Sequence, residues 1–95
     1  MPEMRFTIRW PDGTAESCYS PSLIIRDYFA PGTSYPLADF LDRSREALTI
    51  ASQRVEARYG FPCSRALGQL ARLETAARAF SDQPAARVAV EAFDA

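Results

Sequence analysis

Apolar and polar residues alternate at the start of the chain. Between residues 4 and 10 every even position is apolar and every odd position is polar, the period expected of a half-buried strand. Pro11, Asp12 and Gly13 come next, and this order fits a type I turn closed by a glycine in the left-handed conformation. A second strand over about residues 14 to 20 would complete a β-hairpin.

The turn decides which residues of the second strand face the core. In the bulged register that this turn produces, Phe6 opposes Cys18, and Tyr19 lies beside Arg5 on the outer face. A slipped register, with a two-residue turn, would bury Tyr19 instead. Pro11 has no N–H for the hydrogen bond that flanks such a two-residue turn, so we favour the bulged register.

Two amphipathic helices and one more strand follow an irregular connection. Apolar residues recur at helical spacing from about Leu37 to Tyr59 and again from about Ser64 to Phe80. Gly60 is placed to end the first helix in the left-handed conformation. The period returns to two between Arg87 and Phe93, which predicts a strand. In the connection we expect only a short extended or helical turn near residues 23 to 28.

The order strand, strand, helix, helix, strand predicts an α+β fold. We expect a small two-layer sandwich, in which two helices cover one face of a mostly antiparallel three-stranded sheet. A chain of 95 residues has the size of a single domain, and we assign residues 1–95 to it.

Composition removes most catalytic classes. The sequence has no His, and all eleven of its basic residues are Arg. Without imidazole or a lysine amine there is no Ser-His or Cys-His pair, no Schiff base and no phosphate-loop lysine. We therefore expect a protein without catalytic residues, cofactor or metal.

Charge and hydropathy argue against two classes of partner. Eleven basic and twelve acidic residues are interleaved along the chain and give a net charge of -1, whereas nucleic-acid-binding proteins usually concentrate basic residues. No apolar run approaches the roughly 18 residues of a membrane span. The first residues also lack the features of a signal peptide. We expect a cytoplasmic protein that binds neither nucleic acid nor membrane and keeps Cys18 and Cys63 as free thiols.

Arg5, Arg9 and Tyr19 form a candidate interaction surface. In the favoured register they share the sheet face opposite Phe6, and Arg and Tyr are enriched in protein interfaces. Glu91 and Phe93 could extend this surface from the last strand. The simpler interpretation is a solvated face that carries cross-strand ion pairs.

A second candidate is a pocket roofed by Tyr28, Phe29 and Tyr35, which lie in the irregular connection. Aromatic residues in a loop either form a recognition surface or close the core, and closing the core is the simpler interpretation.

Cys63 is a candidate reactive thiol, because a helix N-terminus favours the thiolate form of a cysteine. The simpler interpretation is a small residue tucked against the helix. The acidic residues Asp39, Asp42 and Glu46 share one helix face. Arg43 and Arg45 are interleaved with them, and we interpret this face as solvated.

Several segments resemble one family of small bacterial proteins, the nitrogen starvation response proteins. The segments occur in the same order along nearly the whole chain, and they are residues 1–6, 9–13, 18–23, 34–40 and 54–61. The resemblance implies a gene setting beside a nitrilase, a radical S-adenosylmethionine protein, an acetyltransferase and a flavin-dependent oxidoreductase, associated with nitrile or cyanide assimilation.

The resemblance brings no catalytic residues with it. The matching positions without an evident role in the fold are Cys18, Tyr19, Ser20, Arg58 and Cys63. We expect a non-enzymatic adaptor that binds a protein partner, either one of the cluster enzymes or a second copy. The alternative is a small-molecule binding or sensing module with a pocket between sheet and helices.

Overall fold

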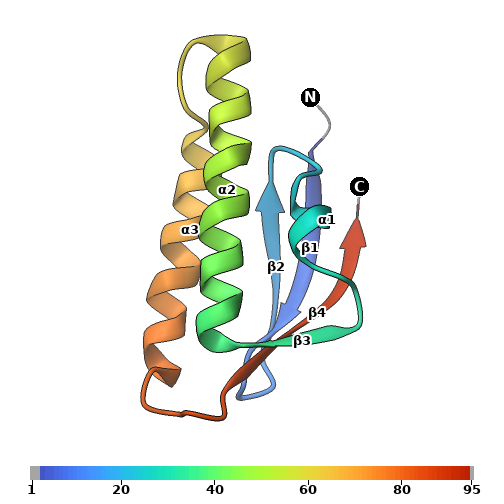
Figure 1. Cartoon of the computed structure of the whole chain (residues 1–95), viewed down its shortest axis with the longest axis vertical. Coiled ribbons are helices and arrows are strands. Elements are labelled where there is room, and N and C mark those ends of the chain that lie inside the picture. Colours follow the sequence, from blue (N-terminus) through green and yellow to red (C-terminus); the bar gives the residue numbers. More distant parts are fainter. Residues whose placement is uncertain (1–2, 95) are drawn as a thin grey trace.

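A four-stranded antiparallel sheet and a pair of long helices form the two layers of the protein (Figure 1). The computed structural model describes residues 3–94. In chain order the elements are β1 (Met4–Arg9), β2 (Ala15–Ser20), α1 (Ile25–Tyr28), β3 (Thr33–Pro36), α2 (Leu37–Tyr59), α3 (Ser64–Ala77), the 3-10 helix η1 (Arg78–Phe80) and β4 (Arg87–Asp94). The strands lie in the order β2-β1-β4-β3.

The predicted α+β class is confirmed, but the predicted number of strands and helices is wrong. Strand β3 was not expected, because only Tyr35 of its four residues is buried and so short a segment shows no period. It forms by pairing with β4, where Tyr35 lies opposite Val88. The helical turn expected near residues 23 to 28 is the short helix α1.

The bulged register of the first hairpin is confirmed. Phe6 lies opposite Cys18 and Arg5 lies opposite Tyr19. Gly13 has a φ of 88°, and its N–H donates to the carbonyl oxygen of Trp10 at 2.9 Å. A residue with a side chain is strained at such a φ, so the glycine allows the turn that sets the register of the sheet.

A β-bulge in β4 corrects the expected position of Phe93. Ile8 pairs with Val90 but Thr7 pairs with Ala92, so Glu91 is the extra residue. Beyond the bulge the side chains change faces, and Phe93 lies opposite Phe6 on the core side, where it is half-buried. Phe93 therefore does not extend the outer face, as strict alternation had suggested.

Helix α2 begins and ends where the sequence predicts, whereas α3 begins where predicted but ends three residues before the predicted Phe80. Gly60 ends α2 with a φ of 89°, and its N–H donates to Glu56 at 2.8 Å. The N–H of Cys63 donates to the buried Ser52 hydroxyl at 3.1 Å, which ties the start of α3 to α2. Helix α3 ends at Ala77 and continues as η1 to Phe80.

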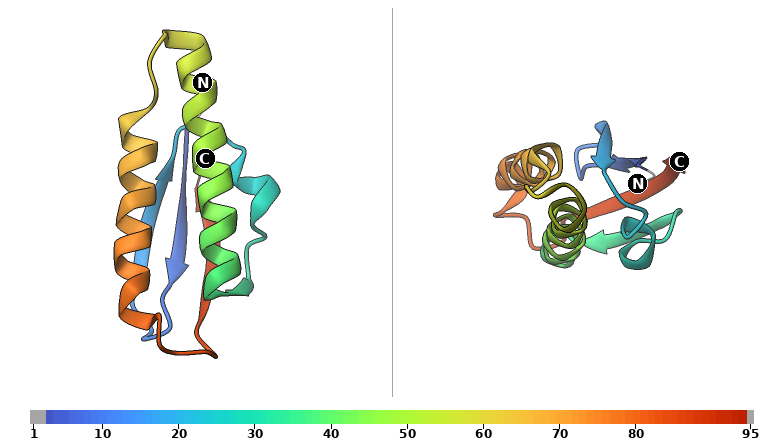
Figure 2. Two further views of the ribbon diagram at one scale, coloured as in Figure 1. Left: turned by 60° about the vertical axis from the view of Figure 1, so that its left-hand side comes forward. Right: turned by 90° about the horizontal axis from the view of Figure 1, so that it is seen from above.

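The helices lie on one face of the sheet, as the view from above in Figure 2 shows. Between the layers, aromatic side chains from β1, α2 and the α1–β3 connection fill the core. Phe40 contacts both Phe29 and Trp10, with ring centroids 5.4 and 5.9 Å apart. Trp10 in turn stacks on Phe80 at 5.9 Å. Among the helices of residues 3–94, none has the length and hydrophobicity needed to cross a membrane.

Two buried serines on α2 predict opposite effects of the same substitution. The Ser44 hydroxyl is fully buried and has no hydrogen-bond partner among the described residues, whereas Ser52 accepts the bond from Cys63. Ser44→Ala removes an unsatisfied polar group and should raise the free energy of unfolding by about 1 kcal/mol. Ser52→Ala should lower it by about 1 kcal/mol, because it leaves a backbone N–H without its partner.

Urea denaturation of the two variants beside the parent protein measures both effects. Each variant replaces a buried helical serine, so the change in helix propensity is the same. Equal changes in the two variants would contradict the assigned hydrogen bonding.

Candidate functional site

The face of the sheet opposite the helices is open. Arg5 and Arg9 project from β1 on this side and are both exposed. The Arg9 Nε atom lies 2.8 Å from the Glu91 carboxylate, and this hydrogen bond, followed by the charge of Glu91, raises the pKa of Arg9. Arg5 makes only a long hydrogen bond of 3.5 Å to the Ser17 hydroxyl. The expected cross-strand ion pair is therefore present at Arg9, while Arg5 has no ion pair within residues 3–94.

Small side chains lie between the arginines. Thr7 is paired with Ser17 on one side and with Ala92 on the other, and paired residues point to the same face. Ala15 and Ala89 flank Arg9 in the same way. The side chains between the arginines of the open face are therefore short, and another backbone can approach the sheet closely there.

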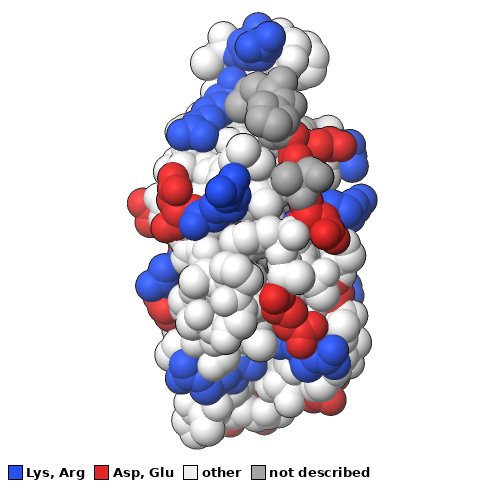
Figure 3. All heavy atoms as spheres, turned by 90° about the vertical axis from the view of Figure 1, so that its right-hand side faces the viewer, with Lys and Arg blue, Asp and Glu red and all other residues white. Residues whose placement is uncertain are grey.

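Charges of both signs are spread over the open face. Figure 3 shows this side of the molecule, where acidic and basic side chains, some of them in contact, lie among uncharged surface. At the β3 edge Arg87 donates to the Ser34 hydroxyl at 2.9 Å and has no ion pair in the described chain. The open face therefore has an excess of one positive charge on β1 and β4. The basic side chains are Arg5, Arg9 and Arg87, and the acidic ones are Glu91 and Asp94.

Tyr19 lies at the border of the open face rather than in it. It is opposite Arg5 as expected, but the Arg65 guanidinium lies 3.9 Å from the centre of its ring. The backbone N–H of Tyr19 also donates to Gln69 of α3 at 3.0 Å. Partial burial, followed by a hydrogen bond to Glu3, raises the pKa of Tyr19 above its ordinary value.

The structure brings Tyr19 and Cys63 together, which the sequence did not indicate. Both line a hollow of about 190 Å³ at the start of α3, whose other lining residues are Glu3, Pro21, Val55 and Tyr59. Cys63 is half-buried there and immediately precedes α3. These residues come from four separate segments, so no local pattern in the sequence could have predicted the hollow.

Cys18 differs from Cys63 in being fully buried. Burial, reinforced by the charge of Glu16, raises the pKa of the Cys18 thiol to about 12. The thiol is therefore protonated and inaccessible at neutral pH, and a thiolate is the form that reacts.

Phe29 and Tyr35 are part of the core. Phe29 is 5.2 Å from Tyr35 and 6.2 Å from Phe6, measured between ring centroids. The Tyr35 hydroxyl accepts the N–H of Ala30 at 2.8 Å, which closes the connection over the core. Tyr28 is half-buried, and its pKa is raised first by desolvation and then by the Glu46 carboxylate. Neither the hollow at Cys63 nor the hollow beside α1 is lined by Tyr28, Phe29 or Tyr35.

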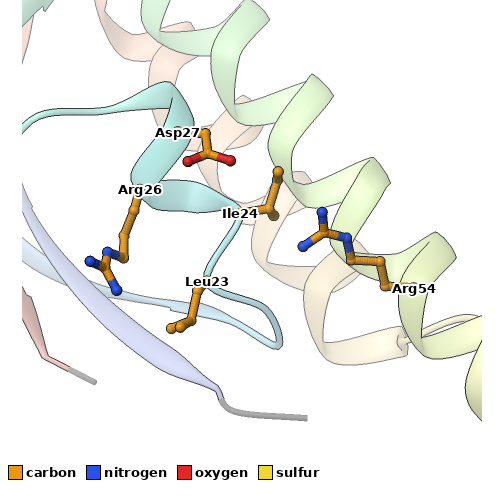
Figure 4. Close-up of a pocket in the computed structure, with 5 residues that line it drawn as sticks. All are labelled: Leu23, Ile24, Arg26, Asp27 and Arg54. Atoms are coloured by element: carbon orange, nitrogen blue, oxygen red, sulfur yellow. The ribbon is translucent and has the colours of Figure 1, made fainter.

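A hollow of about 330 Å³ lies beside α1, shown in Figure 4. It is lined by Leu23, Ile24, Arg26, Asp27 and Arg54. Arg54 donates to the Ser22 hydroxyl at 3.0 Å. In Figure 4 the Arg54 guanidinium points toward Ile24, whereas that of Arg26 points away from it. The two cations therefore do not converge on one ligand position.

Two of the acidic residues on the predicted face of α2 form ion pairs within the helix, whereas Glu46 has no ion pair among the described residues. Asp39 lies 3.0 Å from Arg43, and Asp42 lies 3.2 Å from Arg45. In the part of the chain from residue 3 to residue 94, no three Cys, Asp or Glu side chains gather as metal ligands would.

Comparison with known protein families matches residues 5–93 to the family described as nitrogen starvation-induced protein NitG. The chain belongs to this family. Neither the curated proteins nor the solved structures compared with the chain gave a match. The match confirms the resemblance seen in the sequence, and it covers the open face, both cysteines and all the helices.

The two cysteines should react at very different rates. With iodoacetamide at pH 8 the folded protein should be alkylated once, at Cys63, and the urea-unfolded protein twice, because unfolding exposes Cys18. Intact mass and peptide mapping give the stoichiometry and the position. Alkylation of Cys18 in the folded protein at a rate like that of Cys63 would contradict its burial.

The raised pKa of Cys18 also predicts a dependence of stability on pH. Between the ordinary thiol pKa of about 8.5 and the value of about 12 in the folded protein, the unfolded chain loses a proton that the folded chain keeps. The stability that Cys18 contributes is therefore complete below about pH 8.5 and declines as the pH rises toward 12. Urea titrations of the parent and of Cys18→Ala across this range should show a steeper decline in the parent.

Proposed function

We propose that the protein is a non-enzymatic adaptor of the nitrogen starvation response, which binds a partner protein through the open face of its sheet. The observation that carries this proposal is the one-sided packing of the two layers. Within residues 3–94 the helices cover one face, and the opposite face presents Arg5 and Arg9 around short side chains. Arginine is among the residues enriched where proteins bind each other.

The chemistry of this face favours a protein over a small molecule. The short side chains of Thr7, Ser17 and Ala92 form a flat surface, which suits an extensive contact with another protein. Arg5 is exposed without an ion pair among the described residues, and it is therefore free to meet a carboxylate of the partner. A hydrogen-bonded charge at the interface also fixes the register of the two proteins.

The resemblance of the sequence to its family suggests where the partner is found. It implies a gene cluster that encodes a nitrilase and other enzymes of nitrile or cyanide assimilation. We propose that one of these enzymes is the partner.

A second candidate function is the binding of a small molecule, and the hollow beside α1 favours it. Its volume of about 330 Å³ falls at the lower end of the range of ligand pockets, about 300 to 1,000 Å³. The region beneath Phe29 is filled by the core, so a ligand would use the residues of Figure 4 and not the roof expected from the sequence.

Charge reversal at Arg5 tests the adaptor proposal. The partner is first identified by mass spectrometry after affinity purification from nitrogen-starved cells, and then purified for titration calorimetry. Arg5→Glu should raise the dissociation constant at least tenfold, because it places a carboxylate against the partner's own. Arg78→Glu is the matched control, since Arg78 is also exposed without an ion pair in the described chain but lies beyond the helices, in η1.

The control variant should bind as the parent does. Equal loss of affinity in both variants would show a general charge effect, and unchanged affinity in both would place the contact elsewhere; either result contradicts the proposal. Formation of a complex only between two copies of the chain would replace the partner enzyme by a homodimer.

A further inference from the structure

The turn between α2 and α3 carries the most exposed aromatic side chains of the described chain. Helix α2 extends beyond the sheet at this end of the molecule, and the chain then turns back toward the start of α3 (Figure 1). Tyr59 is 54% exposed and Phe61 is 65% exposed, although both are large apolar residues. A surface of this kind in a small protein often marks a contact with another protein.

A hollow lies next to these aromatics. The hollow of about 190 Å³ described above is lined by Tyr59 together with Val55, Pro21 and the ring of Tyr19. This volume is below the range of about 300 Å³ and more that is typical of small-molecule sites, and it suits an inserted side chain. We call Tyr59, Phe61 and this hollow the tip.

The arginines around the tip outnumber the acidic residues by one when Glu3, which lines the hollow, is counted with Glu56. Between residues 54 and 65 there are three arginines and one glutamate. The Arg58 guanidinium lies 5.7 Å from the centre of the Tyr59 ring. The Arg65 guanidinium lies over the ring of Tyr19, and it is 3.9 Å from the Glu3 carboxylate. Arg58 has no ion pair in the part of the chain that the structure describes. In Figure 3 the outermost charged side chains at this end are basic.

We propose that the tip is a second docking surface, which binds an acidic segment of a partner protein with a large apolar side chain in the hollow. The carboxylates of the segment would meet Arg58 and Arg65. Aromatic residues and arginines around a small pocket are the usual composition of a binding hot spot. The charge of the tip selects an acidic partner, because opposite potentials guide the encounter and like charges oppose it.

A second copy of the chain does not fit the tip. A symmetric dimer places the same patch of both copies face to face. Two tips would then bring Arg58 and Arg65 of one copy against those of the other. This surface is separate from the open face at Arg9, so an adaptor with both could hold two proteins at once.

Site-specific photo-crosslinking identifies what occupies the tip. Phe61→p-benzoylphenylalanine is expressed in nitrogen-starved cells and irradiated, with Ala85→p-benzoylphenylalanine as the control, since Ala85 is exposed in the loop before β4. Mass spectrometry then reads the crosslinked peptide. We expect one segment of another protein, with a large apolar residue flanked by Asp or Glu, from position 61 and not from position 85.

A synthetic peptide of the crosslinked segment then tests the role of charge. Its dissociation constant for the purified protein should rise at least tenfold with Arg58→Glu or with Phe61→Ser. It should also rise with salt, and it should not change with Arg78→Glu. Both Phe61 and Arg58 are exposed, so the variants should fold normally, which circular dichroism checks.

Three results would overturn the proposal. They are a crosslink to another copy of the chain, a crosslink to a basic or uncharged segment, and crosslinking at position 61 no greater than at position 85. None of these results bears on the open face, so the proposal for the tip is tested independently of the proposed adaptor surface.

Discussion

Burial of aromatic rings on one side of the sheet is the constraint on which the rest of the structure depends. Phe40 of α2 joins the two halves of this cluster, because it contacts Phe29 on one side and Trp10 on the other. Full burial of a ring of this size is worth about 1.5 to 3 kcal/mol, and aromatic pairs add about 0.5 to 1.5 kcal/mol.

The composition of the two faces of the sheet follows from this constraint. With its aromatics facing the helices, β1 presents only Arg5, Thr7 and Arg9 on the other side. The bulge at Glu91 has the same effect on β4, because it returns Phe93 to the core side and leaves Ala92 outside. The open face is therefore polar, low and accessible, and these properties are the basis of the proposed role in the nitrogen starvation response.

Local patterns in the sequence predicted the elements whose folding is locally determined. The glycine turn predicted the register of β1 and β2, and the helical period predicted α2 to the residue, from Leu37 to Tyr59. Strand β3 and the bulge could not be predicted, because each exists only through pairing with a distant strand. The meeting of Tyr19 and Cys63 was missed for the same reason, since α3 reaches β2 only in the folded chain.

Arginine footprinting of the complex recovered from nitrogen-starved cells tests the central claim most directly. All eleven basic residues are arginines distributed over the whole chain, so one arginine-specific reagent such as phenylglyoxal reports on every part of the surface. The account predicts that the partner protects Arg5 and Arg9 while Arg26 and Arg78 are labelled as in the free protein. Full labelling of Arg5 and Arg9 in the complex would contradict it.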